Sequence, residues 1–196
     1  TLVAKSHTGH VERALRTSLD ENLEMIRDTV SYLTGQGRRV FLDAEHFFDG
    51  FAMDRAYALE VLRVAGEAGA EVVALCDTNG GMLPDHVGEV VSEVASVVGS
   101  DVRVGIHCHN DTGCAVANSM AAVAAGATHV QGTVNGYGER TGNANLVTVV
   151  ANLQLKKGFD LVTPHQLSRA TSVSHAISEV TNVAPYGRQP YTGSSA

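Results

Sequence analysis

Two histidines separated by one residue are the most chemically informative feature of the sequence. His107 and His109 lie at the end of an apolar run, 102–106, that is typical of a β-strand. Residues i and i+2 of a strand face the same side, so both imidazoles are expected to point into one space, with Cys108 pointing away. Paired nitrogen ligands followed by amide and carboxylate groups suit a divalent metal. The alternative is an ordinary pair of histidines at a strand end, and the motif alone does not decide between them.

Five apolar, strand-like runs alternate with helix-like segments along the chain. The runs fall at 2–4, 39–42, 71–75, 102–106 and 129–134. The first long helix is expected to open with the capping-box pair Ser18 and Glu21. Further helices are expected at 54–69, 84–98, 112–126, 145–157 and 164–182. Strands and helices that alternate at a spacing of about 30 residues predict right-handed βαβ units and a parallel sheet.

The polar residues that follow the runs help to choose between two parallel architectures. From the second run onward, the strand ends carry Asp43 and Glu45; Asp77, Thr78 and Asn79; His107 and His109; and Asn135 and Glu139. In a (β/α)₈ barrel all of these ends meet at one mouth, whereas an open doubly wound sheet gathers only those near its switch point. No G-x-G-x-x-G motif follows a strand, which argues against a nucleotide-binding sheet. The pattern therefore favours the barrel, of which the sequence supplies about five of eight units.

Composition excludes several classes of protein. The chain has 196 residues, 44% of them hydrophobic, and a net charge of −7 without a basic cluster, so nucleic acid is not an expected partner. No apolar run approaches the roughly 20 residues that span a membrane. Three cysteines without C-x-x-C spacing indicate reduced thiols, and we expect a cytoplasmic protein.

Two longer motifs carry a family resemblance. Residues 107–118 and 131–143 resemble the 2-isopropylmalate synthase, homocitrate synthase and citramalate synthase family, and 43–50 with 75–81 look most like its citramalate synthase branch. The resemblance covers essentially the whole chain. It implies a metal-dependent TIM-barrel enzyme that condenses acetyl-CoA with a 2-oxo acid, and it makes the five strands the fourth to eighth of the barrel.

The resemblance also implies a division of the chain. Residues 1–158 would form the partial barrel, and 159–196 a linker and the start of a C-terminal helical subdomain. The end, 193–196, looks like the lead-in to a histidine-containing segment that is implicated in catalysis in the family. The helix at 164–182 resembles subdomain helices that reach toward a second subunit, so a homodimer is expected.

Metal ligands follow from the same resemblance. His107 and His109 match the family's two metal-binding histidines, and Asn143 matches a polar residue at or next to the metal. The metal would be Zn²⁺, Mn²⁺ or Mg²⁺, among which spacing does not choose. The family's remaining protein ligand, an aspartate in an Arg-Asp-Gly motif, is absent from this sequence.

Substrate-binding residues are implied in the same way. Glu45 matches a glutamate that contacts the substrate or metal-bound water, which makes it the candidate catalytic residue. Asp43 lies on the same strand face and is assigned to the substrate site with it. Thr78 matches a threonine that hydrogen-bonds the carboxylate of the 2-oxo acid. No residue is a secure candidate for the general base.

Several of these residues also have a purely structural interpretation. Asp77 could cap the loop that follows it, and Asn143 could cap the helix near 145. Glu139 and Arg140 could form a salt bridge at the barrel rim rather than a catalytic pair. The remaining histidines are expected to be packing or surface residues: His7, His10, His46, His86, His129, His165 and His175.

The favoured function is an acyltransferase that condenses acetyl-CoA with pyruvate to citramalate, in branched-chain (isoleucine and leucine) amino-acid biosynthesis. The alternatives within the enzyme class are a 2-isopropylmalate or homocitrate synthase and a related metal-dependent hydroxyacyl-CoA lyase. An inactive fold fragment or a regulatory partner is the alternative from another class, because part of the metal site is missing from the sequence.

Overall fold

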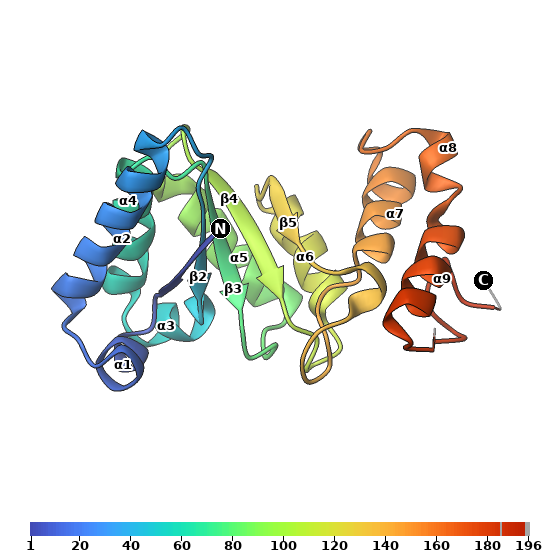
Figure 1. Ribbon diagram of the computed structural model, residues 1–196, viewed down its shortest axis with the longest axis horizontal. Coiled ribbons are helices and arrows are strands. Elements are labelled where there is room, and N and C mark those ends of the chain that lie inside the picture. Colours follow the sequence, from blue (N-terminus) through green and yellow to red (C-terminus); the bar gives the residue numbers. More distant parts are fainter. Residues whose placement is uncertain (185, 195–196) are drawn as a thin grey trace.

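The computed structural model describes residues 1–184 and 186–194. Ser195 and Ala196, which belong to the expected lead-in segment 193–196, lie outside the described residues. Strands and helices alternate along the chain as expected (Figure 1). In order, the elements are β1 (Leu2–Lys5), α1 (Thr8–His10), the π-helical turn η1 (Val11–Leu15), α2 (Leu19–Gly35), β2 (Phe41–Glu45), α3 (Phe47–Met53), α4 (Arg55–Glu67), β3 (Val72–Asp77), α5 (Pro84–Val97), β4 (Arg103–Cys108), α6 (Ala115–Ala124), β5 (His129–Gln131), the 3₁₀ turn η2 (Val134–Gly136), α7 (Leu146–Lys157), α8 (Pro164–Leu167) and α9 (Ala170–Thr181).

The five strands form one parallel sheet in the order β1-β2-β3-β4-β5. Each strand pairs with the next in the chain, so the winding direction never reverses. A doubly wound sheet requires such a reversal, whereas a barrel winds in one direction throughout. The sheet order therefore confirms a (β/α)₈-type fold, present here as five strand–helix units.

The two faces of the sheet have opposite characters. Right-handed crossovers that wind in one direction place their helices on the same face. On that face the strands carry fully buried apolar residues such as Leu42, Leu75 and Ile106. The opposite face carries Lys5, Asp43, Glu45, His107 and Gln131, all of intermediate burial. In a barrel this second face is the interior, so Asp43, Glu45 and His107 face a common space.

Local structure departs from the sequence expectation at the last strand. A strand was expected over 129–134, but β5 ends at Gln131. A Cβ atom at Gly132 would collide with the carbonyl oxygen of Ala144, and Thr133 N–H donates to that oxygen at 3.1 Å. The chain after β5 therefore pairs with the segment that leads into α7 instead of extending the sheet.

The C-terminal helical region also differs from expectation. The helix expected over 164–182 is two helices, α8 and α9, separated by Ser168 and Arg169. The Ser168 hydroxyl donates to the carbonyl of His165 at 2.8 Å, which satisfies a carbonyl at the end of α8. Two short helical segments after β1 and helix α3 after β2 were not expected at all, because they are too short to show a helical period.

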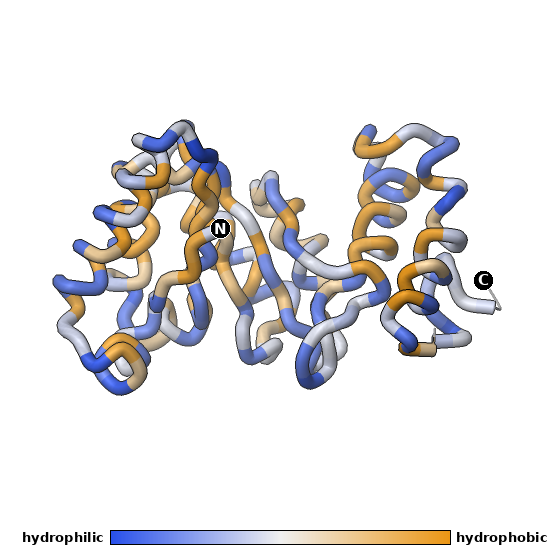
Figure 2. The backbone as a smooth tube through the Cα atoms, viewed as in Figure 1, coloured by the Kyte–Doolittle hydropathy of each residue, from blue (hydrophilic) through white to orange (hydrophobic). Residues whose placement is uncertain are grey.

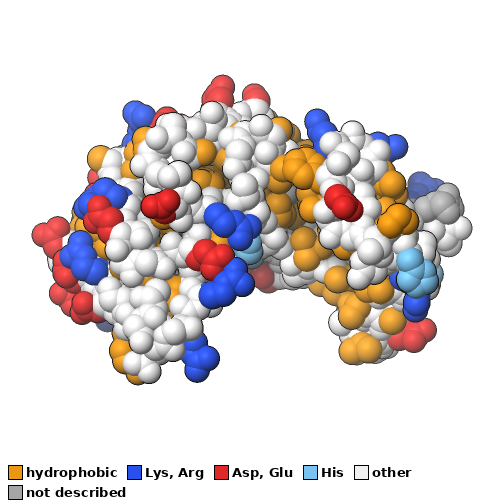
Figure 3. Space-filling view, turned by 90° about the horizontal axis from the view of Figure 1, so that it is seen from above, with side chains coloured by type: hydrophobic (Ala, Val, Ile, Leu, Met, Phe, Trp, Pro, Cys, Tyr) orange, Lys and Arg blue, Asp and Glu red, His pale blue; other side chains and the backbone are white. Residues whose placement is uncertain are grey.

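An apolar cavity lies beside the last strand of the sheet. It measures about 540 Å³ and is lined by α6, β5, α7 and residues 159–162. Figure 3 shows hydrophobic side chains in the hollow between the sheet and the C-terminal helices α7 and α9. Hydrophobic residues also recur along α7 and α9 (Figure 2). Within the described ranges, no helix is long and apolar enough to cross a membrane.

Candidate functional site

The histidine pair lies at the carboxyl end of β4. The ring centroids of His107 and His109 are 5.3 Å apart, so the two imidazoles share one space as expected. The backbone N–H of His109 donates to the carbonyl of Asp77 at 3.2 Å, and His109 also forms an isolated bridge with Asn143. These contacts hold His109, which is 6% exposed, between the end of β3 and the loop after η2.

Asn143 is held by a tightly wound glycine-rich loop. Gly142 has a φ of 84°, and a Cβ atom there would collide with the carbonyl oxygen of Gly136. Asn143 Nδ2 donates to the carbonyl of Tyr137 at 3.0 Å. The helix cap is Asn145, whose Oδ1 accepts from Val147 N–H at 3.1 Å, so the capping role considered for Asn143 is wrong. The Asn143 side-chain oxygen remains available for another partner.

The histidine and asparagine atoms fit a metal in their chemistry. His109 Nδ1 and Asn143 Oδ1 are buried and have no hydrogen-bond partner among the described residues. Burial lowers the pKa of His109, which favours the neutral imidazole that a metal requires. Neutral imidazole nitrogen and amide oxygen are both ligand types for divalent ions. The described chain contains no cluster of three or more His, Cys, Asp or Glu side chains able to hold a metal, so the fit rests on two histidines and an amide.

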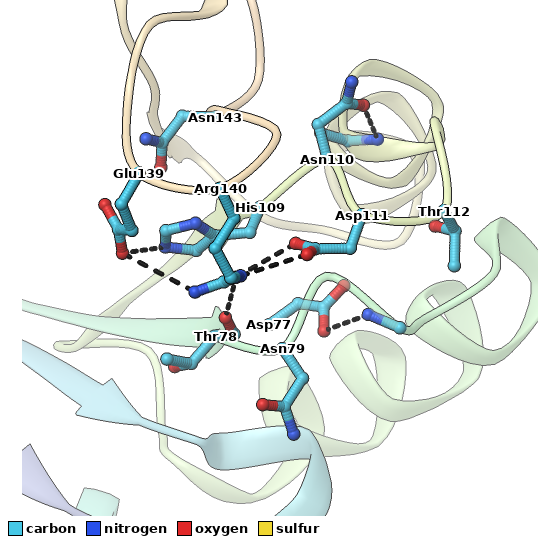
Figure 4. A network of polar contacts seen from close by, with 12 residues as sticks. Asp77, Thr78, Asn79, His109, Asn110, Asp111, Thr112, Glu139, Arg140 and Asn143 are labelled. Carbon is cyan, nitrogen blue, oxygen red and sulfur yellow. Dashed lines mark hydrogen bonds and ion pairs between the residues drawn. The ribbon is translucent and has the colours of Figure 1, made fainter.

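A polar network ties three rim loops together around Arg140 (Figure 4). Arg140 donates to both carboxylate oxygens of Asp111 at 3.0 and 2.9 Å and to the carbonyl of Thr78 at 2.6 Å. The same pairing lowers the pKa of Asp111. Glu139 lies 3.7 Å from Arg140 and 3.6 Å from His109 Nε2. The rim salt bridge considered for Arg140 is therefore present, but its principal partner is Asp111 rather than Glu139.

Thr78 and Asp77 have different roles at the end of β3. The Asp77 carboxylate accepts from the N–H groups of Gly81 and Met82 at 3.1 and 3.2 Å, so Asp77 caps its own loop. The hydroxyl of Thr78 accepts from the backbone N–H of His46 at 2.8 Å. Because a hydroxyl has one hydrogen of its own, this bond leaves Thr78 free to donate to an incoming acceptor.

Glu45 occupies the other end of the rim. Its carboxylate forms an ion pair with Lys5, its register partner on β1, and about a quarter of each side chain is exposed. Glu45 makes no hydrogen bond to the histidine pair within the part of the chain that the structure describes. Lys5 was missed in the sequence because the first strand was expected to stop at Ala4; its place two residues after Val3, at a strand end, was the available signal.

Three of the histidines expected to be packing or surface residues form a cluster beside Glu45. The rings of His7 and His10 stack at 4.3 Å, and His46 meets His10 edge-on at 4.4 Å. His46 also approaches Asp49 at 3.3 Å. Packing was one of the two roles expected for His7 and His10, and the ring contacts show that they pack on each other and on His46.

Asp43 reaches the histidine pair through a residue that sequence reasoning missed. Gln131 Nε2 donates to Asp43 Oδ1 at 2.7 Å, and Gln131 Oε1 lies 2.8 Å from His107 Nδ1. Asp43 and Gln131 are 88 positions apart in the sequence. The expected strand over 129–134 did contain Gln131, but nothing in its local pattern points to His107.

Curated relatives match the chain along its whole length. It is 61% identical over 196 residues to an (R)-citramalate synthase of Streptomyces coelicolor and 49% identical over 196 residues to one of Aquifex aeolicus. A probable 2-isopropylmalate synthase of Methanopyrus kandleri is 40% identical over 187 residues, 95% of the chain. The chain spans only 36–37% of the length of these relatives.

Solved structures share the fold. An HMG-CoA lyase of Bacillus subtilis superposes with a TM-score of 0.76 at 20% identity, covering 95% of this chain and 64% of that one. The carboxyl transferase domain of Rhizobium etli pyruvate carboxylase superposes with a TM-score of 0.63 at 18% identity, covering 86% and 28%. The HMGL-like family matches residues 1–177. The chain therefore belongs to the HMGL-like family.

Proposed function

We propose that this chain supplies part of the active site of an enzyme that condenses acetyl-CoA with a 2-oxo acid, with pyruvate as the acceptor and citramalate as the product. The observation that carries the proposal is the rim itself: His107, His109 and Asn143 offer metal-ligand atoms, and Thr78 offers a donor just after the neighbouring strand β3. The choice of pyruvate is supported by the (R)-citramalate synthase relatives at 44–61% identity.

A divalent ion held by His107, His109 and Asn143 would polarise the ketone of a bound 2-oxo acid. The remaining tasks fall to the chain's own groups. Thr78 donates its hydroxyl hydrogen to the substrate carboxylate, because a carboxylate only accepts and the bond from His46 N–H leaves that hydrogen free. Glu45 contacts the substrate or a water molecule. Before the substrate binds, the ion pair with Lys5 balances the charge of the Glu45 carboxylate. Arg140 fixes the rim loops through Asp111, so that these groups keep their relative positions.

Steady-state assays of the full-length protein test this function. CoA release from acetyl-CoA is measured with pyruvate, 2-oxoisovalerate and 2-oxoglutarate as acceptors, with and without prior removal of metal. The proposal predicts the largest kcat/KM with pyruvate and loss of turnover after chelation. Equal or greater kcat/KM with 2-oxoisovalerate or 2-oxoglutarate would replace the citramalate assignment by a 2-isopropylmalate or homocitrate synthase. Absence of CoA release with every acceptor would reject the condensing activity.

We also propose that the protein acts in the cytoplasm as a homodimer, in branched-chain amino-acid biosynthesis. Cys76, Cys108 and Cys114 are all unpaired, which fits a reducing compartment. In the C-terminal region, Val180 and Tyr186 expose 84% and 67% of their surfaces, which would suit contact with a second copy. Light scattering of the full-length protein tests this assembly, and a monomeric mass at micromolar concentration would reject it.

A further inference from the structure

A string of three side chains crosses the open face of the sheet beneath the rim. Asp43 on β2, Gln131 on β5 and His107 on β4 are joined by hydrogen bonds of 2.7 and 2.8 Å. All three side chains are partly buried. In the sheet, β3 lies between β2, which carries Asp43, and the adjacent strands β4 and β5. The string therefore depends on the curvature of the sheet rather than on neighbouring positions in the sequence.

Small residues in the intervening strands allow this reach. Asp43 is in register with Ala74, Ala74 with Gly105, and Gly105 with His129. A Cβ atom at Gly105 would lie 3.0 Å from the His129 ring and 3.2 Å from the Cα atom of Ala74. The sheet face is therefore closed tightly at this layer, which brings the β2 and β5 side chains within hydrogen-bond distance over β3 and β4.

The direction of the string is set by its carboxylate end. A carboxylate accepts hydrogen bonds and has none to donate, so the amide nitrogen of Gln131 must face Asp43. The amide oxygen of Gln131 then faces His107, and it too only accepts. His107 Nδ1 must consequently carry the hydrogen, which leaves a lone pair on Nε2.

We propose that Asp43 and Gln131 are positioning residues that hold His107 in the Nδ1–H tautomer and so present Nε2 to the rim. The consequence for metal binding rests on the proposed function, in which His107 is a metal ligand. Partners that orient a ligating histidine typically change metal affinity by about 10–100-fold when they are removed. Asp43, assigned from the sequence to the substrate site, would thereby act on the metal site through Gln131.

The tautomer is measured first, without metal. Histidine-selective ¹⁵N labelling of the metal-free protein at pH 8 distinguishes the protonated from the unprotonated ring nitrogen, and a His107→Gln variant identifies the His107 signals by their loss. The proposal predicts hydrogen on Nδ1 of His107. Hydrogen on Nε2 would overturn it, whatever the metal affinity of the protein.

An isosteric variant tests the directing role of the carboxylate. Asp43→Asn keeps the size of the side chain but can donate as well as accept, so Gln131 can turn over and the Nε2–H tautomer of His107 becomes populated. Gln131→Met removes the acceptor and should do the same, whereas Gln131→Glu keeps an oxygen at that place and should preserve Nδ1–H. An unchanged tautomer in both Asp43→Asn and Gln131→Met would overturn the proposal.

Metal titration then separates this inference from the proposed function. Calorimetric titration with Zn²⁺ or Mn²⁺ should show an affinity about 10–100-fold lower in Gln131→Met than in the original protein, with Gln131→Glu closer to the original. Gln36→Met, at the exposed end of α2, is the matched control and should change nothing. Unfolding midpoints within a few degrees of the original confirm that each variant is folded. Failure of the original protein to bind metal would reject the proposed metal site, while the tautomer result would still decide the positioning role.

Discussion

The two ends of the strand rim satisfy their polar atoms in different ways. At the β1–β2 end, Glu45 is paired with Lys5, and the backbone N–H of His46 donates to the Thr78 hydroxyl of the neighbouring strand end. At the β4–β5 end, His109 Nδ1 and Asn143 Oδ1 are buried without a partner among the described residues. A buried polar atom left unsatisfied costs about 1–3 kcal/mol, so the second end favours a ligand that the first end does not require.

One atom at the β1–β2 end is an exception to this difference between the two ends. His7 Nδ1 is also buried without a partner in the described part of the chain. Its ring, however, is stacked on His10 at 4.3 Å with the planes 18° apart, so the two imidazoles pack face to face rather than converging on a point. The two regions therefore differ in their surroundings: the unsatisfied atom of His7 belongs to a stacked histidine pair, whereas those of His109 and Asn143 belong to two segments joined by a backbone bridge.

The largest effect is expected from removing a ligand at the β4–β5 end. His109→Ala should weaken Zn²⁺ or Mn²⁺ binding by more than about 100-fold, because loss of a ligand exceeds the 10–100-fold effect of losing its supporting partner. Calorimetric titration measures the change. His86→Ala, on an exposed turn of α5, is the matched control and should leave the affinity unchanged. Equal affinity in the two variants would remove the distinction between the two ends of the rim.

A smaller effect is expected from loosening the loop that carries Asn143. Gly142→Ala places a Cβ atom against the Gly136 carbonyl at a φ of 84°, which should lower the free energy of unfolding by about 1–3 kcal/mol. Denaturant unfolding measures it. Gly88→Ala, in α5 with open space around it, should instead stabilise by about 0.5–1 kcal/mol. Metal affinity should fall in Gly142→Ala and stay unchanged in Gly88→Ala. An unchanged metal affinity in Gly142→Ala would show that the Asn143 loop has no part in the site.

The β1–β2 end should respond through stability rather than metal affinity. Lys5→Met removes the ion pair with Glu45, and since both side chains are about one-quarter exposed we expect a loss of only about 0.5–1 kcal/mol. Metal affinity should change less than about threefold, because Lys5 does not contact the histidine pair. A loss of metal affinity comparable to that of His109→Ala would show that the two ends form one coupled site.

The smallest effect is expected from pH. The pKa values of His10, His109 and His129 are all lowered from the usual 6.5, each chiefly by burial. Below about pH 6.5 the unfolded chain therefore takes up protons that the folded chain resists, and stability falls as pH falls. Denaturant unfolding of the metal-free protein at pH 7.5 and pH 5.5 should show the lower free energy at pH 5.5. An increase on acidification would contradict the burial assigned to these histidines.

The sequence was sufficient for the order and type of the main elements. Periodicity placed five strand–helix units and the alternation placed the strand-end residues on one rim, because both depend on local spacing. It also predicted correctly that His107 and His109 share a face, which follows from the two-residue period of a strand. The short helices and the break between α8 and α9 depend on single hydrogen bonds and could not be read from a pattern.

Side-chain contacts between different strands could not be predicted from the sequence, for a physical reason. The pairing of Lys5 with Glu45 depends on the register between β1 and β2, and that of Gln131 with Asp43 depends on sheet curvature over two intervening strands. Arg140 was recognised as a candidate for a salt bridge, but its choice of Asp111 over Glu139 depends on how two loops meet. Spacing identifies which residues reach the rim, whereas tertiary packing decides which of them touch.

Anomalous diffraction from crystals soaked in Mn²⁺ or Zn²⁺ tests the central claim most directly. The account predicts a single strong peak beside His107, His109 and Asn143, at the β4–β5 end of the rim. A peak within the His7–His10–His46 cluster instead, or no peak at the histidine pair at saturating metal, would contradict it.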